Sequence, residues 1–81
     1  MTDIAIDRKL DMRGFQCPIP VVKTNLEIKT MDPGQVLKVL ATDKGALADF
    51  PAWAEDTGNE IVSSGEEDGA LVFLIRRGVE E

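Results

Sequence analysis

The only cysteine of this 81-residue sequence, Cys17, stands in the tetrapeptide Cys17-Pro18-Ile19-Pro20. The tetrapeptide follows a strand-like segment and opens a helix-like one. This order predicts a lone thiol at the positive end of a helix dipole, which stabilises a thiolate or a persulfide anion. Pro20 disfavours a helical conformation at Ile19, although Ile19 lies in the first turn of the predicted helix. Such a conflict between local preference and predicted structure, directly beside the thiol, is typical of functional sites. These residue types predict nucleophilic sulfur chemistry at Cys17.

Charged residues near Cys17 act on the thiol in opposite directions. Arg13 lies four residues earlier on a short loop, and Lys44 follows the second predicted strand. Either cation favours the anionic form of the sulfur if it approaches. The acidic segment 66–68 is expected at the same edge of the sheet and disfavours that form. The sequence leaves the sum of these effects open.

The composition leaves three roles open for Cys17. A dithiol oxidoreductase needs a resolving cysteine, which this sequence lacks. A zinc site within one chain is excluded because there is no histidine and one cysteine. We therefore predict neither a metal nor a cofactor. What remains is a persulfide carrier, a regulatory or protein-binding module with a structural cysteine, or a thiol that senses oxidants.

The chain is acidic, because its 15 Asp and Glu residues outnumber its 9 Lys and Arg residues and give a net charge of −6. Such a surface repels phosphate backbones, so we expect no direct nucleic-acid binding and docking onto basic protein surfaces instead. The longest apolar run, residues 70–75, is too short to cross a bilayer, and the N-terminus lacks the layout of a signal peptide. We expect a single domain over residues 1–81, monomeric and cytoplasmic.

Apolar periodicity predicts a strand and a helix around the cysteine. The strand ends near Met12 and has one apolar face: Ile4, Ile6, Leu10 and Met12. After a loop at residues 13–16, the helix has Cys17 as its N-cap and Pro18 at its first position. It is expected to bury Ile19, Val22 and Leu26. A turn at residues 32–34 ends this part of the chain.

A second strand and helix follow with the same order. Residues 36–41 are apolar on both faces, which is typical of an inner strand. Asp43 is expected to cap a helix with a buried stripe of Leu47, Phe50 and Ala54. Pro51 should kink or split this helix, and Gly58 should end it. Trp53 is expected to pack in the core.

The last segment predicts two strands, at residues 60–63 and 71–75, joined by a polar loop at residues 65–69. The final strand is apolar on both faces, and we expect neighbouring side chains to shield Val72 and Leu74. Arg76 and Arg77 are expected as a solvated tail at the edge away from Cys17.

The order βαβαββ predicts an α/β (α+β) two-layer sandwich, a four-stranded mixed sheet with both helices on one face. Right-handed crossovers make the first two strands parallel and bring both strand-to-helix loops to the same edge of the sheet. We therefore expect Cys17 to be a neighbour of residues 43–45. The candidate site consists of Cys17 as the nucleophile and these supporting residues: Arg13, Gly14, Pro18, Pro20, Asp43 and Lys44.

Over nearly its whole length the sequence resembles the TusA/SirA/YedF family of sulfur carriers. The motifs that carry the resemblance are Leu10-Asp11-Met12-Arg13-Gly14, Cys17-Pro18-Ile19-Pro20, Gly34-Gln35-Val36-Leu37, Ala41-Thr42-Asp43-Lys44-Gly45, Asp49-Phe50-Pro51-Ala52-Trp53-Ala54 and Thr57-Gly58-Asn59-Glu60. The resemblance implies a two-layer fold of four strands and two helices, which agrees with the order of elements predicted above. The Cys-Pro-x-Pro element in this setting is highly specific.

The resemblance implies that Cys17 accepts sulfane sulfur from a cysteine desulfurase or a rhodanese-type enzyme, as a sulfurtransferase does. It further implies a DsrE/TusD-type acceptor, with tRNA thiolation, sulfur oxidation or molybdenum-cofactor synthesis as outlets. Two residues depart from the family pattern: Lys44 stands where many relatives have proline, and Asn59 where many have histidine. Any assistance that the histidine gives in relatives is missing from this chain.

Overall fold

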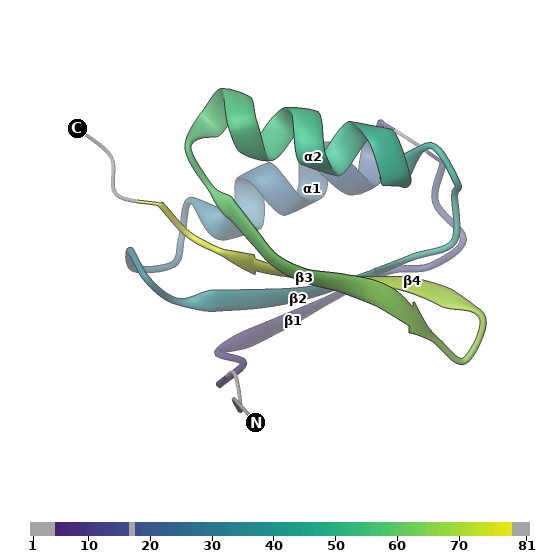
Figure 1. The fold of residues 1–81 in the computed structure, drawn as a ribbon, viewed down its shortest axis with the longest axis horizontal. Helices are drawn as coiled ribbons and strands as arrows, with labels where there is room; N and C mark the ends of the chain where they lie inside the picture. Colours follow the sequence, from purple (N-terminus) through teal and green to yellow (C-terminus); the bar gives the residue numbers. More distant parts are fainter. Residues whose placement is uncertain (1–4, 17, 79–81) are drawn as a thin grey trace.

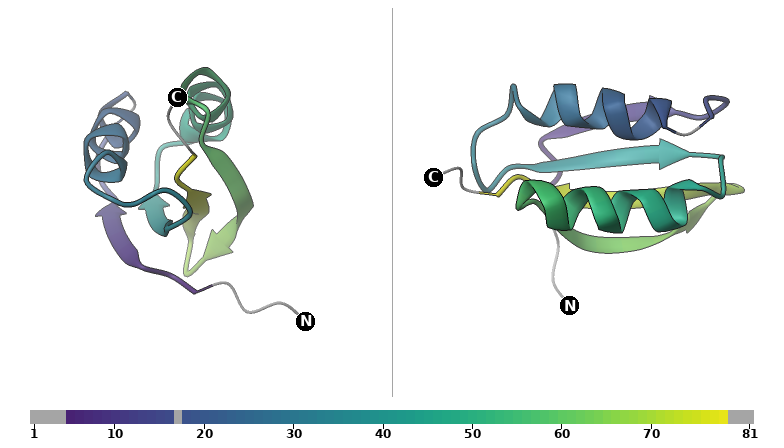
Figure 2. Two further views of the ribbon diagram at one scale, coloured as in Figure 1. Left: turned by 90° about the vertical axis from the view of Figure 1, so that its left-hand side faces the viewer. Right: turned by 90° about the horizontal axis from the view of Figure 1, so that it is seen from above.

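The computed structural model of the protein describes residues 5–16 and 18–78. These residues form six elements in the predicted order (Figure 1): β1 Arg8–Met12, α1 Ile19–Ile28, β2 Val36–Ala41, α2 Ala46–Thr57, β3 Glu60–Glu67 and β4 Ala70–Arg76. The strands form one mixed sheet, and both helices lie on the same face of it (Figure 2). The α+β two-layer sandwich predicted from the sequence is therefore confirmed. Neither described helix is long and apolar enough to span a membrane.

The strand order β1-β2-β4-β3 determines where the connecting loops lie. β1 and β2 are parallel, with Met12 opposite Ala41, and β4 is antiparallel to β2, with Ala41 opposite Leu71. The carboxyl ends of β1 and β2 and the β3–β4 hairpin therefore share one end of the sheet. A parallel pair needs a crossover connection, which α1 provides.

The core lies between β2, β4 and the two helices. Leu37 and Val39 of β2 are completely buried, which confirms an inner strand. Phe50 of α2 stacks on Phe73 of β4 with ring centroids 4.6 Å apart, and it meets Trp53 edge to face at 6.0 Å. Such aromatic pairs contribute about 0.5–1.5 kcal/mol beyond the burial of their area.

The first strand is shorter than predicted. It begins at Arg8, and Ile6 lies before it with 46% of its surface exposed. The segment before β1 is instead held by Asp7, whose N–H donates to the Val36 carbonyl at 2.9 Å. The Asp7 carboxylate also accepts from the Val36 N–H at 2.8 Å. Ile4 lies outside the described residues.

The buried face of α1 is the opposite of the predicted one. Ile19, Val22 and Leu26 are 44%, 52% and 56% exposed. The residues that face the core are spaced by four positions: Pro20, Thr24 and Ile28. The prediction was wrong because α1 has apolar residues on several faces, so the apolar pattern alone does not select which face meets the sheet.

The start of α1 is displaced by one residue from the prediction. The N-cap is Pro18 and the first helical residue is Ile19, so Pro20 takes the second position. Neither proline needs an N–H at the start of a helix, where those groups have no intrahelical partner. The Pro18 carbonyl accepts the first helical hydrogen bond, from the Val22 N–H at 2.9 Å.

The start of α2 also differs from the prediction, because Gly45 rather than Asp43 is its N-cap. Leu47 is 56% exposed, whereas Phe50 and Ala54 are buried as predicted. Pro51 lies inside one unbroken helix, so it does not split α2. Burial of Phe50, Trp53 and Ala54 offsets the hydrogen bond that proline removes.

Gly58 ends α2 as predicted. It has a left-handed φ of +75°, and the Asn59 N–H donates back to the Ala54 carbonyl at 3.0 Å. This bond closes the helix in the manner of a Schellman motif, which glycine permits without strain.

The β3–β4 hairpin is tighter than predicted. Its strands run to Glu67 and from Ala70, so only Asp68 and Gly69 form the turn, with φ angles of +51° and +80°. Asp-Gly is a preferred pair for a two-residue turn with both φ angles positive, which explains why the five-residue loop was wrong. Val72 and Leu74 are half-buried, which confirms that neighbours shield them.

Arg77 is not part of a solvated tail. Its N–H donates to the Gln35 carbonyl and its carbonyl accepts from the Gly34 N–H, both at 2.9 Å. Its guanidinium also donates to the Met31 carbonyl. Arg76 pairs with Glu60 at 3.0 Å. Both arginines lie at the end of the sheet opposite the strand-to-helix loops, as predicted.

A buried polar side chain, Thr24, tests how α1 packs on the sheet. Thr24 is completely buried, and its hydroxyl has no hydrogen-bond partner among the described residues. Replacing Thr24 by valine keeps the branched shape and removes the unpaired hydroxyl. We expect T24V to raise the free energy of unfolding by about 1 kcal/mol, measured by urea denaturation.

Thr57→Val is the matched control, because the Thr57 hydroxyl donates to the Trp53 carbonyl at 2.7 Å. We expect this control to be neutral or slightly destabilised. If T24V lost stability as well, the hydroxyl of Thr24 would have a partner in solution, and this account of the buried face of α1 would be wrong.

Candidate functional site

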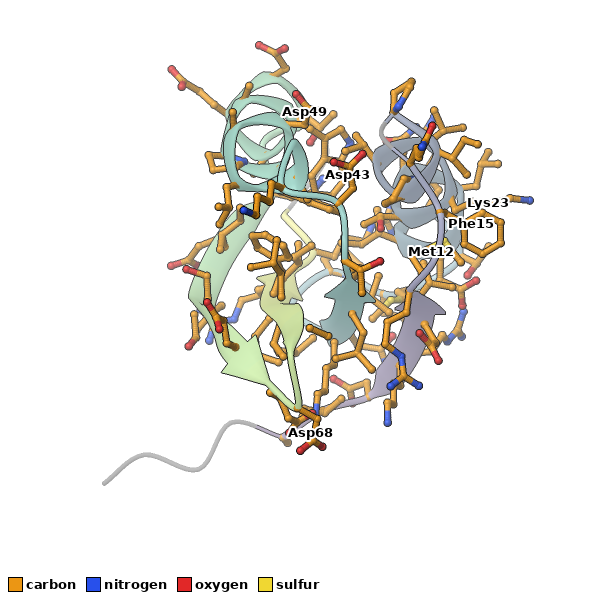
Figure 3. All side chains as sticks on the ribbon, turned by 90° about the vertical axis from the view of Figure 1, so that its right-hand side faces the viewer. Met12, Phe15, Lys23, Asp43, Asp49 and Asp68 are labelled. Atoms are coloured by element: carbon orange, nitrogen blue, oxygen red, sulfur yellow. The ribbon has the colours of Figure 1, made fainter. Side chains whose placement is uncertain are left out.

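The two strand-to-helix loops meet at one end of the sheet, as the sequence predicted. The Gly14 N–H, in the loop after β1, donates to the Thr42 hydroxyl, in the loop after β2, at 2.9 Å. Figure 3 looks onto this end, with Phe15 and Asp43 on the two loops and Asp68 on the hairpin below. Between the loops lies a depression of about 390 Å³, lined by Gly14, Phe15, Gln16, Thr42, Asp43 and Lys44.

The loop after β1 turns sharply at Gly14, which has a φ of +88° that side-chain-bearing residues rarely adopt. The Phe15 N–H donates back to the Met12 carbonyl at 3.3 Å and closes the turn. Phe15 itself is 45% exposed. Gly14 therefore acts through the backbone: it directs the chain toward the cysteine-containing tetrapeptide while its N–H holds the second loop.

Arg13, in the turn after β1, binds Asp11 of that strand. Its side-chain nitrogens bind the two Asp11 carboxylate oxygens at 2.9 and 2.8 Å, and its backbone N–H donates to the same carboxylate at 3.1 Å. These hydrogen bonds lower the pKa of Asp11 to about 2. The guanidinium is bound to Asp11 in this arrangement. Stabilisation of the anionic form of the Cys17 sulfur by Arg13 therefore stays a prediction.

Asp43 shapes the second loop. Its carboxylate accepts from the Gly45 N–H at 3.0 Å, and its carbonyl accepts from the Ala46 N–H at 3.0 Å. These bonds turn the chain into α2, although Asp43 is two residues before the N-cap. Lys44 is exposed and lines the depression between the loops.

The tetrapeptide itself is described in part. Pro18 is exposed at the start of α1, and Pro20, in the first turn of that helix, is buried. Cys17 lies outside the described residues, so its predicted roles as nucleophile and N-cap are not tested by the geometry. The described residues on both sides of it, Gln16 and Pro18, belong to the loop and the helix start that were predicted to carry it.

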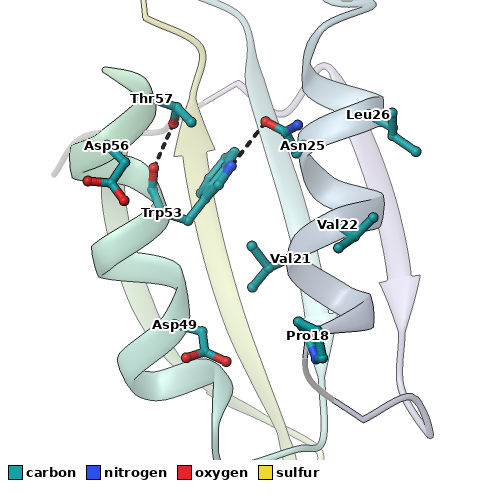
Figure 4. Close-up of a pocket in the computed structure, with 9 residues that line it drawn as sticks. All are labelled: Pro18, Val21, Val22, Asn25, Leu26, Asp49, Trp53, Asp56 and Thr57. Carbon is teal, nitrogen blue, oxygen red and sulfur yellow. Dashed lines mark hydrogen bonds between the residues drawn. The ribbon is translucent and has the colours of Figure 1, made fainter.

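A groove between α1 and α2 was missed by the sequence analysis (Figure 4). It has a volume of about 530 Å³ and begins at Pro18. The Trp53 indole N–H donates to the Asn25 side-chain oxygen at 3.1 Å and joins the two helices across it. The sequence contains a signal for this groove, because α1 has more apolar residues than one buried face needs. The prediction assigned Val22 and Leu26 to the core, and so it left no apolar surface for a groove.

The Asp11–Arg13 pair leads to a prediction about pH. Because the folded state lowers the Asp11 pKa from 3.8 to about 2, it favours the carboxylate. The pair therefore contributes to stability above about pH 4, and this contribution is lost as the pH falls toward 2. In Arg13→Gln we expect the Asp11 pKa, measured by carboxyl NMR titration, to return toward 3.8.

Lys9→Gln is the control, since Lys9 contributes least among the causes of this shift. It should leave the Asp11 midpoint nearly unchanged. A wild-type midpoint near 3.8 would show that the pair does not persist in solution.

Comparison with known proteins agrees with this geometry. Residues 8–77 match the family model described as Sulfurtransferase TusA. The chain is 45% identical over 71 residues to the sulfur carrier protein TusA of Allochromatium vinosum, covering 88% of this chain and 93% of that protein. It is 40% identical to a putative sulfur carrier protein of Aquifex aeolicus, where the match covers 99% of this chain and 41% of the relative.

Among solved structures, the crystal structure of a SirA-like protein from Desulfitobacterium hafniense superposes with a TM-score of 0.77 at 26% identity. The match covers 89% of this chain and 99% of that one. The shared fold agrees with the sandwich described above. Since the family model spans both strand-to-helix loops and the Cys17 tetrapeptide, the chain belongs to the TusA family of sulfur carriers.

Proposed function

We propose that this protein accepts sulfane sulfur as a persulfide on Cys17 and relays it to an acceptor protein. The observation that carries the proposal is that the only cysteine lies within the residues matched by a sulfur-carrier family, in the tetrapeptide Cys-Pro-Ile-Pro. α1 begins at Ile19, two residues further along the chain. The positive end of a helix favours an anion carried on the chain that leads into it.

The proposed transfer consists of two substitutions at sulfur. In loading, the Cys17 thiolate attacks the outer sulfur of a donor persulfide, R–S–SH; a new S–S bond forms on Cys17, and the donor leaves as its thiolate. In unloading, an acceptor thiolate attacks the outer sulfur of Cys17–S–SH, and the Cys17 thiolate leaves. The transferred sulfur keeps its proton and the total oxidation state is unchanged. The protein thus acts as a sulfurtransferase without a cofactor or an external oxidant.

The proposed donor is a cysteine desulfurase or a rhodanese-type enzyme, and the proposed acceptor is a DsrE/TusD-type protein. Both exchanges are proposed to take place in the cytoplasm, in tRNA thiolation or in sulfur oxidation, with residues 1–81 acting as one monomeric domain. The net charge of −6 supports docking onto basic protein surfaces. In this proposal, four residues shape the chain around the sulfur: Gly14, Pro18, Pro20 and Asp43. Lys44 adds positive charge to the depression between the loops.

Cys17→Ser tests the carrier chemistry. Because serine cannot form a persulfide, we expect complete loss of sulfur acceptance with an unchanged fold. The wild-type protein should gain the mass of one sulfur atom after incubation with a cysteine desulfurase and cysteine, and should lose it on reduction. Intact-protein mass spectrometry measures both.

The double variant Cys17→Ser, Ser63→Cys is the matched control, because it moves the thiol to an exposed position on β3. We expect it to load at least tenfold more slowly than the wild type if the loops and α1 contribute roughly 1.4 kcal/mol to the transfer. Loading of Cys17→Ser, or equal loading of the relocated thiol, would contradict the proposed role of Cys17.

A further inference from the structure

The groove between α1 and α2 has two chemically different walls (Figure 4). The α1 wall contains Val21, Val22 and Leu26, and the α2 wall contains Asp49 and Asp56. Val22 and Leu26 are more than half exposed, at 52% and 56%. Apolar surface of this kind beside polar groups is typical of a binding surface for another protein.

The two carboxylates of the α2 wall are available to a partner. The ion pairs among the described residues engage Asp11, Glu27, Glu60 and Glu67, and none of them involves Asp49 or Asp56. Asp49 lies toward the Pro18 end of the groove and Asp56 toward the Thr57 end. Their separation of seven positions corresponds to two helical turns, about 10 Å along the axis.

We infer that this groove binds an amphipathic basic helix of a partner protein. The apolar stripe of that helix lies on Val22 and Leu26, and two basic side chains seven positions apart lie over Asp49 and Asp56. The pattern follows from charge complementarity and from the helical repeat, since residues seven apart share one face of a helix. A second copy of this chain is disfavoured as the occupant because each copy has a net charge of −6.

The groove is placed to serve the transfer of sulfur. Pro18 lies at one end of it and directly follows Cys17 in the chain. A helix held there fixes a donor or acceptor protein beside the segment that carries Cys17. The identity of the partner as a donor or an acceptor of sulfur rests on the proposed function, whereas binding of a basic helix does not.

Trp53 allows the binding to be measured without a label. It is the only tryptophan of the chain, it lines the groove, and its indole N–H is bonded to Asn25. The probe is a peptide of about 18 residues, long enough to form a helix, made of alanine, leucine and lysine with two lysines seven positions apart on the edge of the leucine stripe. We expect saturable binding, seen as a change in Trp53 emission, that weakens as salt is added.

Neutralising the acidic wall tests the assignment. We expect Asp49→Asn with Asp56→Asn to weaken peptide binding about tenfold. Glu55→Gln with Glu66→Gln changes the net charge equally at exposed residues that do not line the groove, and it should change the affinity by less than about twofold. The apolar wall is tested by Leu26→Ser, which should weaken binding at an exposed position where folding is not at risk.

Three results would overturn the inference. They are the absence of saturable binding, an equal loss in the charge-matched control, and a dimer of the free protein in sedimentation experiments that Leu26→Ser dissociates. Glutathione persulfide, which has no helix to dock, separates the two proposals, and the Asp49→Asn, Asp56→Asn variant should load from it normally. In the wild type, normal loading without peptide binding would contradict the groove proposal and leave the carrier proposal intact. Peptide binding without loading in the wild type would do the reverse.

Discussion

The parallel pairing of β1 with β2 is the constraint on which the rest of the structure depends. β2 is an inner strand between β1 and β4, and β1 has one apolar face, Leu10 and Met12, that packs against the core. A slip of β1 by one residue would turn Lys9 and Asp11 toward the core instead, so the register is specified. That register sets Met12 opposite Ala41 and brings the loops after both strands to one end of the sheet. The hydrogen bond from Gly14 to Thr42 is a consequence of this pairing.

The second constraint is the way α1 lies on the sheet. The residues of α1 that pack on the sheet are Pro20, Thr24 and Ile28, one of which is polar, while three apolar side chains face outward: Ile19, Val22 and Leu26. This orientation leaves apolar surface beside α2, where Asp49 and Asp56 face it across the groove. The orientation of α1 therefore supplies the apolar wall of the groove.

Much of the fold could be predicted because strong local signals agreed with one another. The turn at residues 32–34 ends in Gly34 with a φ of +90°, and Gly58 closes α2 in the left-handed conformation. Both positions require the freedom of glycine, which can be read from the sequence. The predictions failed where the signal was ambiguous: the face of α1, the cap of α2 and the length of the hairpin strands. Packing on the sheet decided the face of α1, whereas the hairpin followed the local preference of Asp68-Gly69 for a two-residue turn.

The sequence by itself determined the order of the elements, the single thiol and its tetrapeptide, because each depends on residue types and on spacing along the chain. It also determined that the two loops share one edge, because parallel strands joined by right-handed crossovers leave no other arrangement. Only the tertiary structure decided that Arg13 binds Asp11, that Asp43 turns the chain before Gly45, and that α1 and α2 enclose a groove. These features depend on how a helix is rotated and on which side chain reaches which partner, and both are set by packing across the whole molecule.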